Sequence, residues 1–324
     1  MPVDAVVVDG RPGLLWMDFR DVTFTEPFFQ QTVDRVRATH PDRGERFTGF
    51  DELLRFEKSI ESVPPTGFIF HSSRCGSTLL ANACRAIDNS IVLSEANAID
   101  KLVARFITDA NDRVKESLYS VFLRAVVNVL AQRRTGEERL LFIKFSCCSI
   151  SQLERIKRIW PAVPWIFLYR DPVETIVSNM ATVPAWLVDE DHRILAHITG
   201  TSPVEVAQMS LEERCARSIG SFYSTAAGAH TLANGNSMLL NYNQLSVPAL
   251  TGIVSFFKVE VSNKGLERIA SGSRIYSKEV SGTREFTPDA NAKQRDASDL
   301  VRKMAERWAS EPYHLLEGKS KYRS

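Results

Sequence analysis

The sequence predicts an α/β fold, in which helices cover both faces of a parallel β-sheet that follows a small N-terminal α+β extension. Two observations lead to this prediction. Short apolar segments alternate with helical patterns along most of the chain, as strands and helices do in parallel sheets. The 324 residues, of which 44% are hydrophobic, are also enough to fill the core of one large domain.

The first 65 residues form the predicted extension, and the α/β domain takes residues 66–324. A Gly- and Pro-containing turn at residues 10–13 separates two apolar segments and predicts a hairpin. Two helical patterns follow, and Pro64-Pro65 ends the extension. The predicted strands and helices of this part are residues 5–8, 14–19, 27–38 and 50–60.

Five apolar segments are the predicted strands of the main sheet, at residues 68–70, 91–93, 140–145, 165–169 and 238–241. A helical insertion at residues 98–133, with a break near residues 109–112, separates the second strand from the third. Two further segments, residues 181–205 and 277–298, are predicted to be long loops. Long irregular connections in a compact domain often act as functional lids.

Composition narrows the classes of function. The formal net charge is +1, which gives no electrostatic footprint for nucleic acid or an anionic membrane. The first residues lack a signal-peptide pattern, and no apolar run approaches the roughly 20 residues that span a bilayer. Five cysteines without metal-site spacing predict reduced thiols. We therefore expect a cytoplasmic protein without nucleic-acid or membrane partners.

The segment after the first strand of the sheet has the pattern of an anion-binding loop. His71 to Gly76 follow the strand, and apolar residues at helical spacing then predict a helix over residues 77–87. The free N–H groups and the dipole of a helix start favour an anion, Gly76 allows close approach, and Arg74 supplies positive charge. The segment predicts a phosphate cradle of P-loop type, with a polar turn that binds no ligand as the alternative.

A second anion anchor is predicted after the strand at residues 165–169. Arg170 follows this strand directly. Asp171 is the expected N-cap of the next helix, Pro172 its first residue, and Glu174 the partner that completes a capping box. Ligands of open α/β sheets bind beyond the carboxyl ends of strands, so Arg170 should face the same crevice as the first loop. Two anion anchors in one crevice predict a ligand with two phosphate groups.

Together these segments resemble the motifs of the sulfotransferases that use 3′-phosphoadenosine 5′-phosphosulfate (PAPS). The loop after the first strand of that family has a basic residue, a small residue, Gly and two Ser/Thr, and Arg74-Cys75-Gly76-Ser77-Thr78 fits this order. The second family motif is Arg-Asn/Asp-Pro with a Ser eight positions beyond the Arg, which Arg170-Asp171-Pro172 and Ser178 match. The resemblance covers residues 67–257, and the two motifs are specific jointly rather than singly.

The resemblance implies roles for these residues. Arg74 and the N–H groups from Cys75 to Thr78 would hold the 5′-phosphosulfate and stabilise the leaving group, without a metal. Arg170 and Ser178 would bind the 3′-phosphate. Asn241-Tyr242-Asn243-Gln244-Leu245 is similar to a Tyr-Glu-Asp-Leu segment of the family, which would place Tyr242 near the adenine or the 3′-phosphate. Core packing is an equally good interpretation of Tyr242.

The resemblance also implies a base for the acceptor hydroxyl. Members that bind phenols and steroids have Lys-Thr-His after the third strand, where this chain has Lys144-Phe145-Ser146. Lys144 fits the basic position, facing the bridging oxygen or the sulfonate, but Ser146 replaces the His. Other members use a Glu after the second strand, which makes Glu95 the predicted base. Helix capping is the alternative for Glu95, a solvent-facing lysine for Lys144, and His71 is the second choice of base.

The acceptor is predicted to be a small or medium organic alcohol or phenol. Residues 181–205 carry apolar side chains suited to an acceptor lid, with a helix pair over the sheet edge as the alternative; these are Trp186, Leu187, Val188 and Ile194, beside His192. Related enzymes close the 3′-phosphate site with a basic C-terminal loop. The basic residues of residues 277–298 are Lys278, Arg284, Lys293 and Arg295.

Two other functions stay open at this point. The first is a P-loop kinase that uses ATP and Mg²⁺, with Asp171 as the metal-side carboxylate. A standard ATP loop has Gly at the position of His71 and Lys at that of Ser77, so the sequence argues against it, although Gly76 and Thr78 fit. The second is a nucleotide-binding module without catalysis.

Overall fold

The computed structural model describes residues 1–20, 22–109, 112–272 and 289–320. A five-stranded sheet forms its centre, and every neighbouring pair of strands is parallel. The strand order is β5-β6-β4-β7-β8. The α/β prediction is confirmed, and each predicted strand is present to within one residue at each end. The strands are β4 (Gly67–His71), β5 (Ser90–Ser94), β6 (Leu140–Lys144), β7 (Trp165–Tyr169) and β8 (Ser237–Asn241).

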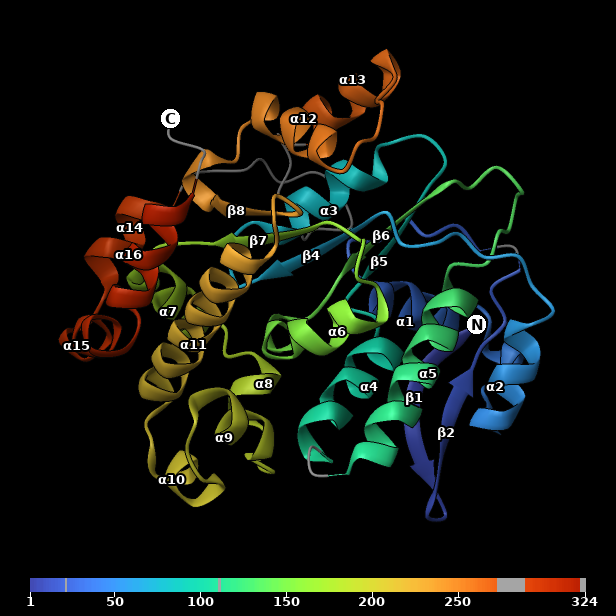
Figure 1. Cartoon of the computed structure of the whole chain (residues 1–324), viewed down its shortest axis with the longest axis horizontal. Helices are drawn as coiled ribbons and strands as arrows, with labels where there is room; N and C mark the ends of the chain where they lie inside the picture. The colour runs from blue at the N-terminus through green and yellow to red at the C-terminus, as the bar shows by residue number, and fades with distance from the viewer. Residues whose placement is uncertain (21, 110–111, 273–288, 321–324) are drawn as a thin grey trace.

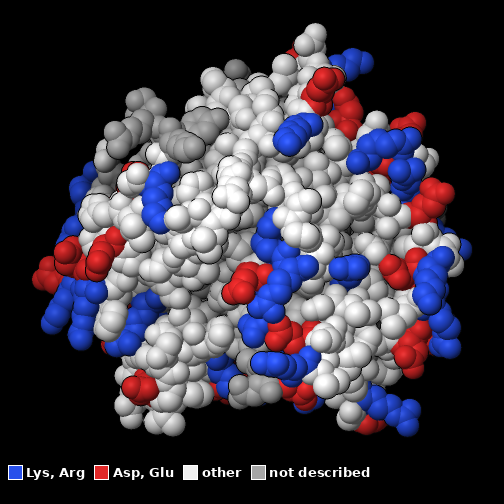
Figure 2. All heavy atoms as spheres, in the orientation of Figure 1, with Lys and Arg blue, Asp and Glu red and all other residues white. Residues whose placement is uncertain are grey.

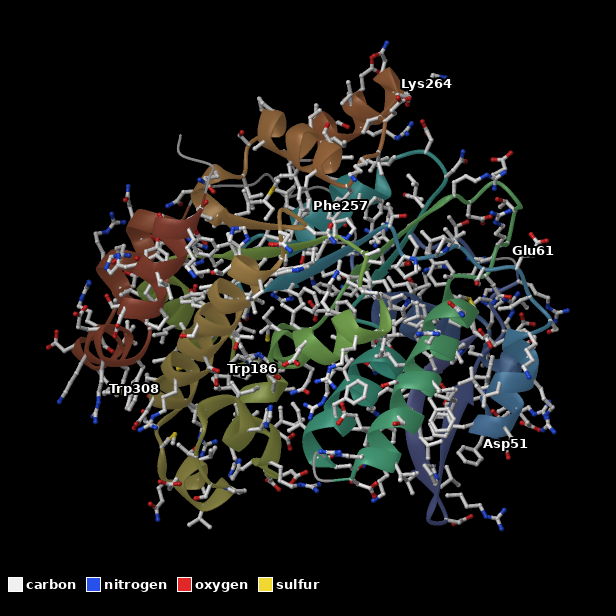
Figure 3. All side chains as sticks on the ribbon, viewed as in Figure 1. Asp51, Glu61, Trp186, Phe257, Lys264 and Trp308 are labelled. Atoms are coloured by element: carbon white, nitrogen blue, oxygen red, sulfur yellow. The ribbon has the colours of Figure 1, made fainter. Side chains whose placement is uncertain are left out.

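Side chains of each central strand point alternately to two hydrophobic layers. Phe68 and Phe70 of β4 belong to one cluster, and Ile69 between them belongs to the other. In Figure 1, α3 (Ser77–Arg85), α12 (Val247–Phe256) and α13 (Asn263–Gly272) lie above the sheet, with α6 (Leu153–Ile159) and α11 (Leu211–Leu232) below it. Figure 3 labels one aromatic residue of each layer, Phe257 near α12 and Trp186 near α11. Burial on both faces explains why the strands read as continuous apolar runs.

The N-terminal extension is a three-stranded antiparallel sheet with two helices. Its strands β1 (Pro2–Val8), β2 (Arg11–Trp16) and β3 (Arg46–Gly49) lie in this order. The predicted turn at residues 10–13 is wrong, because only Asp9 and Gly10 turn, with φ of 47° and 73°, and Arg11 already pairs with Val8. Strand β3 was not predicted. The helices are α1 (Phe29–Thr39) and α2 (Phe50–Glu57), with the 3-10 turn η1 (Pro41–Arg43).

Strand β1 packs against the helices inserted between β5 and β6, which are α4 (Asn97–Thr108) and α5 (Arg113–Leu130). Val3 and Leu14 of the extension belong to the same hydrophobic cluster as Phe68 of the main sheet. The core is therefore continuous across Pro65, and the domain boundary there stays a prediction.

The two predicted loops contain helices. Residues 181–205 follow α7 (Pro172–Ala181) and include α8 (Ala185–Val188), α9 (Arg193–Thr199) and the start of α10 (Pro203–Gln208), so the loop prediction is wrong. Of the segment 277–298, Lys278 and Arg284 lie outside the described residues, whereas Lys293 and Arg295 lie on α14 (Ala290–Asp296). The remaining elements are η2 (Cys147–Gln152), η3 (Tyr242–Gln244), α15 (Asp299–Trp308) and α16 (Ser310–Lys319).

The surface carries charges of both signs. Figure 2 shows Lys and Arg interspersed with Asp and Glu over the face that it draws. This mixture fits the near-neutral formal charge of the sequence. Among the described helices, none is long and apolar enough to cross a membrane.

Candidate functional site

The predicted site residues meet at the carboxyl ends of the five strands. All of them line one cavity of about 370 Å³, which we call the first cavity. Each strand contributes to it, because parallel strands end at the same edge of the sheet. The contributions are Arg74 to Thr78 after β4, Glu95 after β5, Lys144 at the end of β6, Arg170 and Ser178 after β7, and Tyr242 after β8. Their proximity was predicted from the sequence, and their roles stay predictions.

The loop after β4 lines the first cavity and has left-handed backbone conformations. Ser73, Arg74 and Gly76 have φ of 73°, 50° and 82°. Such runs of left-handed residues form concave anion sites at functional positions. A Cβ at Gly76 would lie 2.5 Å from Leu245 Cδ1, so only glycine fits. The first N–H groups of α3 have no acceptor within the helix and remain available to a ligand.

Arg74 and Cys75 lie differently within this loop. Arg74 is half-buried, and its Nη2 donates to the Thr182 carbonyl at 3.0 Å. Over the part of the chain that the structure describes, no carboxylate forms an ion pair with Arg74, so its charge is available to an anion. Cys75 is fully buried, and its thiol lies 3.2 Å from the Leu168 carbonyl. Burial raises the pKa of this thiol, so Cys75 offers the cavity its backbone and not a reactive sulfur.

Arg170 is buried, with 3% of its surface exposed, and two carboxylates hold it. Its Nε donates to Glu174 at 2.6 Å and its Nη2 to Asp289 at 2.7 Å. The ring of Tyr242 lies 4.2 Å from the guanidinium carbon. Asp289 also binds Lys293 at 2.7 Å. The predicted anchor of the 3′-phosphate is therefore already neutralised by carboxylates, one of them buried and the other half-exposed.

The start of α7 confirms one capping prediction and corrects another. The Asp171 side chain accepts the Glu174 N–H at 3.1 Å, as an N-cap does. It also accepts from Gln294 Nε2 at 3.0 Å and does not line the first cavity, which gives no support to a metal-binding role. The predicted capping box is wrong, because the Glu174 carboxylate binds Arg170 and is not the partner of the Asp171 N–H.

Glu95 and Lys144 form an ion pair in the first cavity. Glu95 Oε1 also lies 3.3 Å from His71 Nε2. Burial opposes ionisation of Glu95, but Lys144 and His71 outweigh it and hold the pKa of this carboxyl well below its ordinary value. The capping alternative for Glu95 is wrong, because the N-cap of α4 is Ala96 and no side chain caps that helix.

The tautomer of His71 follows from its neighbours. Nδ1 accepts the Ser73 N–H at 3.1 Å, which places the proton of the neutral ring on Nε2, facing Glu95. In this arrangement the protonated Nε2 faces the Glu95 carboxylate at 3.3 Å. A ring whose Nδ1 already accepts a backbone N–H and whose Nε2 carries the proton is not arranged as a base, and this role of His71 stays a prediction.

Phe28 is a site residue that sequence reasoning missed. It precedes α1 in the N-terminal extension and lines the first cavity. Its ring lies 4.6 Å from Lys144 Nζ, and only 1% of Lys144 is exposed. The alternative of a solvent-facing Lys144 is therefore wrong. No local pattern marks Phe28, because its contact is with a residue more than a hundred positions away.

A second cavity, of about 380 Å³, adjoins the first. Ser146, Cys147 and Trp186 line both. Its walls come from α4, η2 and the segment containing α8 and α9, and the apolar lining residues are Val103, Ala104, Ile107, Ala185, Trp186, Ile194 and Leu195. Of the predicted lid, Trp186, His192 and Ile194 line this cavity, whereas Leu187 is buried elsewhere and Val188 is exposed.

Comparisons with known proteins find similar chains among solved structures only. No family model matches the chain, and no curated protein matches it. A sulfotransferase from Alicyclobacillus acidocaldarius has 13% identity and a TM-score of 0.42, over 79% of this chain and 96% of that one. The sulfotransferase domain of the Synechococcus PCC 7002 olefin synthase has 14% identity and a TM-score of 0.42, over 80% and 95%. Mouse sulfotransferase SULT7A1, complexed with PAP, has 13% identity and a TM-score of 0.39, over 86% and 93%.

These solved structures belong to the class that the two sequence motifs resemble.

Proposed function

We propose that this protein transfers the sulfuryl group of PAPS to the hydroxyl of a small or medium organic acceptor. The observation that carries the proposal is that both anion anchors, the Arg74 to Thr78 loop and the Arg170–Ser178 pair, line one cavity. The 5′-phosphosulfate belongs at the loop and the 3′-phosphate at Arg170. Tyr242 lies between the two anchors, with its ring against Arg170 and close to Gly76, which fits a place beside the nucleotide.

Two features of the site favour this donor over ATP. Ser77 stands where an ATP loop has Lys, and Arg170 is a second anchor for which ATP has no phosphate. The Asp289 carboxylate accepts a hydrogen bond from Nη2 of Arg170, where an oxyanion of a ligand could bind instead. In our proposal a 3′-phosphate replaces Asp289, while buried Glu174 keeps the guanidinium oriented through its Nε.

Sulfuryl transfer needs charge stabilisation more than covalent help from the protein, if it follows the loose transition state of phosphoryl transfer. The acceptor oxygen attacks sulfur in line, and charge develops on the leaving 5′-phosphate. Arg74 and the first N–H groups of α3 are suited to stabilise that charge. Lys144 is suited to the bridging oxygen or the sulfonate, held by Glu95 and by the ring of Phe28.

Glu95 is the carboxylate that the sequence predicts as the base. Glu95 lines the first cavity, as the sequence predicts for this role. Its ion pair with Lys144 keeps it ionised, but the same charge makes it a weak proton acceptor.

Calorimetry with adenosine 3′,5′-bisphosphate (PAP), the desulfonated product, tests the donor. We expect micromolar binding of PAP and much weaker binding of ATP with Mg²⁺. Arg74→Ala should weaken PAP binding about tenfold or more, since hydrogen bonds to charged groups contribute roughly 1.5–3 kcal/mol. Arg74 is in no buried ion pair of the described structure, so this variant should fold.

The matched control is Arg158→Ala, which removes an exposed arginine from α6, outside the first cavity. It should bind PAP like the parent protein. Stronger binding of ATP with Mg²⁺ than of PAP would favour a kinase, and absence of binding by both nucleotides would overturn the proposed function.

A further inference from the structure

We propose that Asp100 accepts the proton of the acceptor hydroxyl, and that the acceptor is an apolar alcohol or phenol seated in the second cavity. This inference rests on the proposed sulfuryl transfer and deepens it. It assigns the proton to a carboxylate that no sequence motif marks. Glu95 then holds Lys144 in place of acting as the base.

The position of Asp100 carries the proposal. Asp100 lies in the first turn of α4 and lines the second cavity. Its Oδ1 accepts the Ser146 N–H at 3.1 Å and lies 3.4 Å from Ser149 Oγ. Ser146 lines both cavities, so the carboxylate is fixed at the junction between them. A hydroxyl that reaches from the second cavity toward the sulfuryl group must pass this junction.

The cavity itself defines the class of acceptor. Apolar side chains of α4 and of the segment with α8 and α9, including Trp186, form much of its wall, and the polar lining residues include Asn97, Ser149, Asp189 and His192. Lys101 is the one lysine or arginine among its described lining residues, and it binds Asp4 at 2.7 Å. A sulfated or phosphorylated acceptor would therefore find no free lysine or arginine in this wall. An apolar body with a single hydroxyl fits this lining.

The groups around Asp100 set its proton affinity. No Lys or Arg of the described residues forms an ion pair with it. Burial and the negative charge of Glu95 raise the pKa of Asp100 to about 7, against the opposing effects of the Ser146 N–H and Lys144. The other titratable groups that face the second cavity are Lys101, Cys147, Cys148, Asp189 and His192.

Glu95 and Asp100 thus form a pair of carboxyls whose pKa values are shifted in opposite directions. When the pKa values of two carboxyls in one site are shifted apart, one carboxylate can serve as the partner of a charge and the other as the base. A base is most effective when its pKa lies near the working pH. Asp100 meets this condition, and Glu95, bound to Lys144, does not.

The proposed step balances without another reactant. The acceptor oxygen forms a bond to sulfur while the bond from sulfur to the 5′-phosphate oxygen of PAPS breaks, and the electron pair of that bond stays on the phosphate. The hydroxyl proton moves to the Asp100 carboxylate and then to solvent. The products are the sulfate ester, PAP and a proton.

The test compares a series of phenols of rising acidity, from phenol to 4-nitrophenol, as acceptors with PAPS, and measures PAP release by chromatography. The variants are Asp100→Asn and Glu95→Gln. Asp109→Asn, which removes a carboxylate at the other end of α4 outside both cavities, is the control. Calorimetry with PAP and thermal unfolding first establish that each variant is folded and binds the nucleotide.

For phenol, kcat/KM of the parent protein should rise with pH and level off above about 7, because the base must be ionised. Asp100→Asn should lower it by about a hundredfold or more and abolish the pH limb. The loss should shrink toward 4-nitrophenol, whose hydroxyl is most easily ionised. Glu95→Gln should keep the limb and move it to lower pH, because the charge that raises the pKa of Asp100 is gone. Asp109→Asn should behave like the parent protein.

Three outcomes would overturn the inference. One is an equal loss in Asp100→Asn along the whole series, which indicates a structural role. Another is a pH limb that persists in Asp100→Asn or disappears in Glu95→Gln. The last is PAP binding without turnover of any phenol, which contradicts the assigned acceptor class while leaving the nucleotide site intact. Failure to bind PAP is a different result and counts against the proposed function itself.

Discussion

At the level of single residues, the two arginines of the site differ in whether carboxylates already neutralise their charge. Arg170 is held by Glu174 and Asp289, whereas Arg74 has no carboxylate partner in the described structure. Glu174 is buried and Asp289 is 46% exposed at its side chain, so the two carboxylates are not equivalent. Removing Glu174 would leave the buried Arg170 guanidinium with only the half-exposed Asp289 as a partner, which is costly. Asp289 is the one that a ligand can displace.

Asp289→Asn should tighten PAP binding. The aspartate competes with a 3′-phosphate for Arg170, and a half-exposed ion pair contributes at most about 1 kcal/mol, which corresponds to about fivefold in affinity. Calorimetry with PAP measures the change. Asp289 is the N-cap of α14, and Asp296, the last residue of this helix, lies outside the first cavity, so Asp296→Asn is the control and should leave affinity unchanged. Weaker binding in Asp289→Asn would mean that this carboxylate supports the site and does not compete with the ligand.

At the scale of the element, the N-terminal extension supplies part of the site. Helix α1 begins after Phe28, and the Gln31 side chain accepts the Phe28 N–H at 3.1 Å. Gln30 contacts Asn97, in the first turn of α4, through a hydrogen bond of 2.9 Å. These bonds fix Phe28 over Lys144 and tie the extension to the helix that carries Asp100. The extension therefore belongs to the site as well as to the fold.

Phe28→Ala should lower kcat by roughly threefold to thirtyfold, because a desolvated cation–π contact contributes about 0.5–2 kcal/mol. PAP affinity should change little, since Phe28 packs on Lys144, which belongs to neither anion anchor. Phe28→Trp should restore most of the rate by restoring a ring above the ammonium. Phe56→Ala, an aromatic residue of α2 outside both cavities, is the control. If Phe28→Ala and its control lose rate equally, the effect is one of stability.

At the level of the whole molecule, the sequence predicts those strands and site residues that a short stretch of chain defines by itself. The five strands were predictable because burial on both faces makes them continuously apolar. The predicted residues of the first cavity other than Ser178 were predictable because they stand within or soon after a strand end, whereas Ser178, inside α7, was identified from the motif resemblance. Phe28, Asp100 and Asp289 were not, because their roles depend on contacts between distant segments. Helix α10 does carry a sequence signal for a helix start, because Ser202 and Glu205 form a capping box around Pro203. We nevertheless interpreted this segment as a loop.

A nucleotide that engages both anion anchors should stabilise the whole fold, because those anchors join strands β4 and β7 of the central sheet. At a PAP concentration a hundred times its dissociation constant, the stabilisation is about 2.7 kcal/mol. This corresponds to a rise in Tm of roughly 5 °C for a domain of this size class. Thermal unfolding followed by fluorescence measures it. Adenosine 5′-monophosphate, which lacks the 3′-phosphate, should raise Tm much less at the same concentration. Equal shifts with both nucleotides would show that Arg170 does not bind a 3′-phosphate.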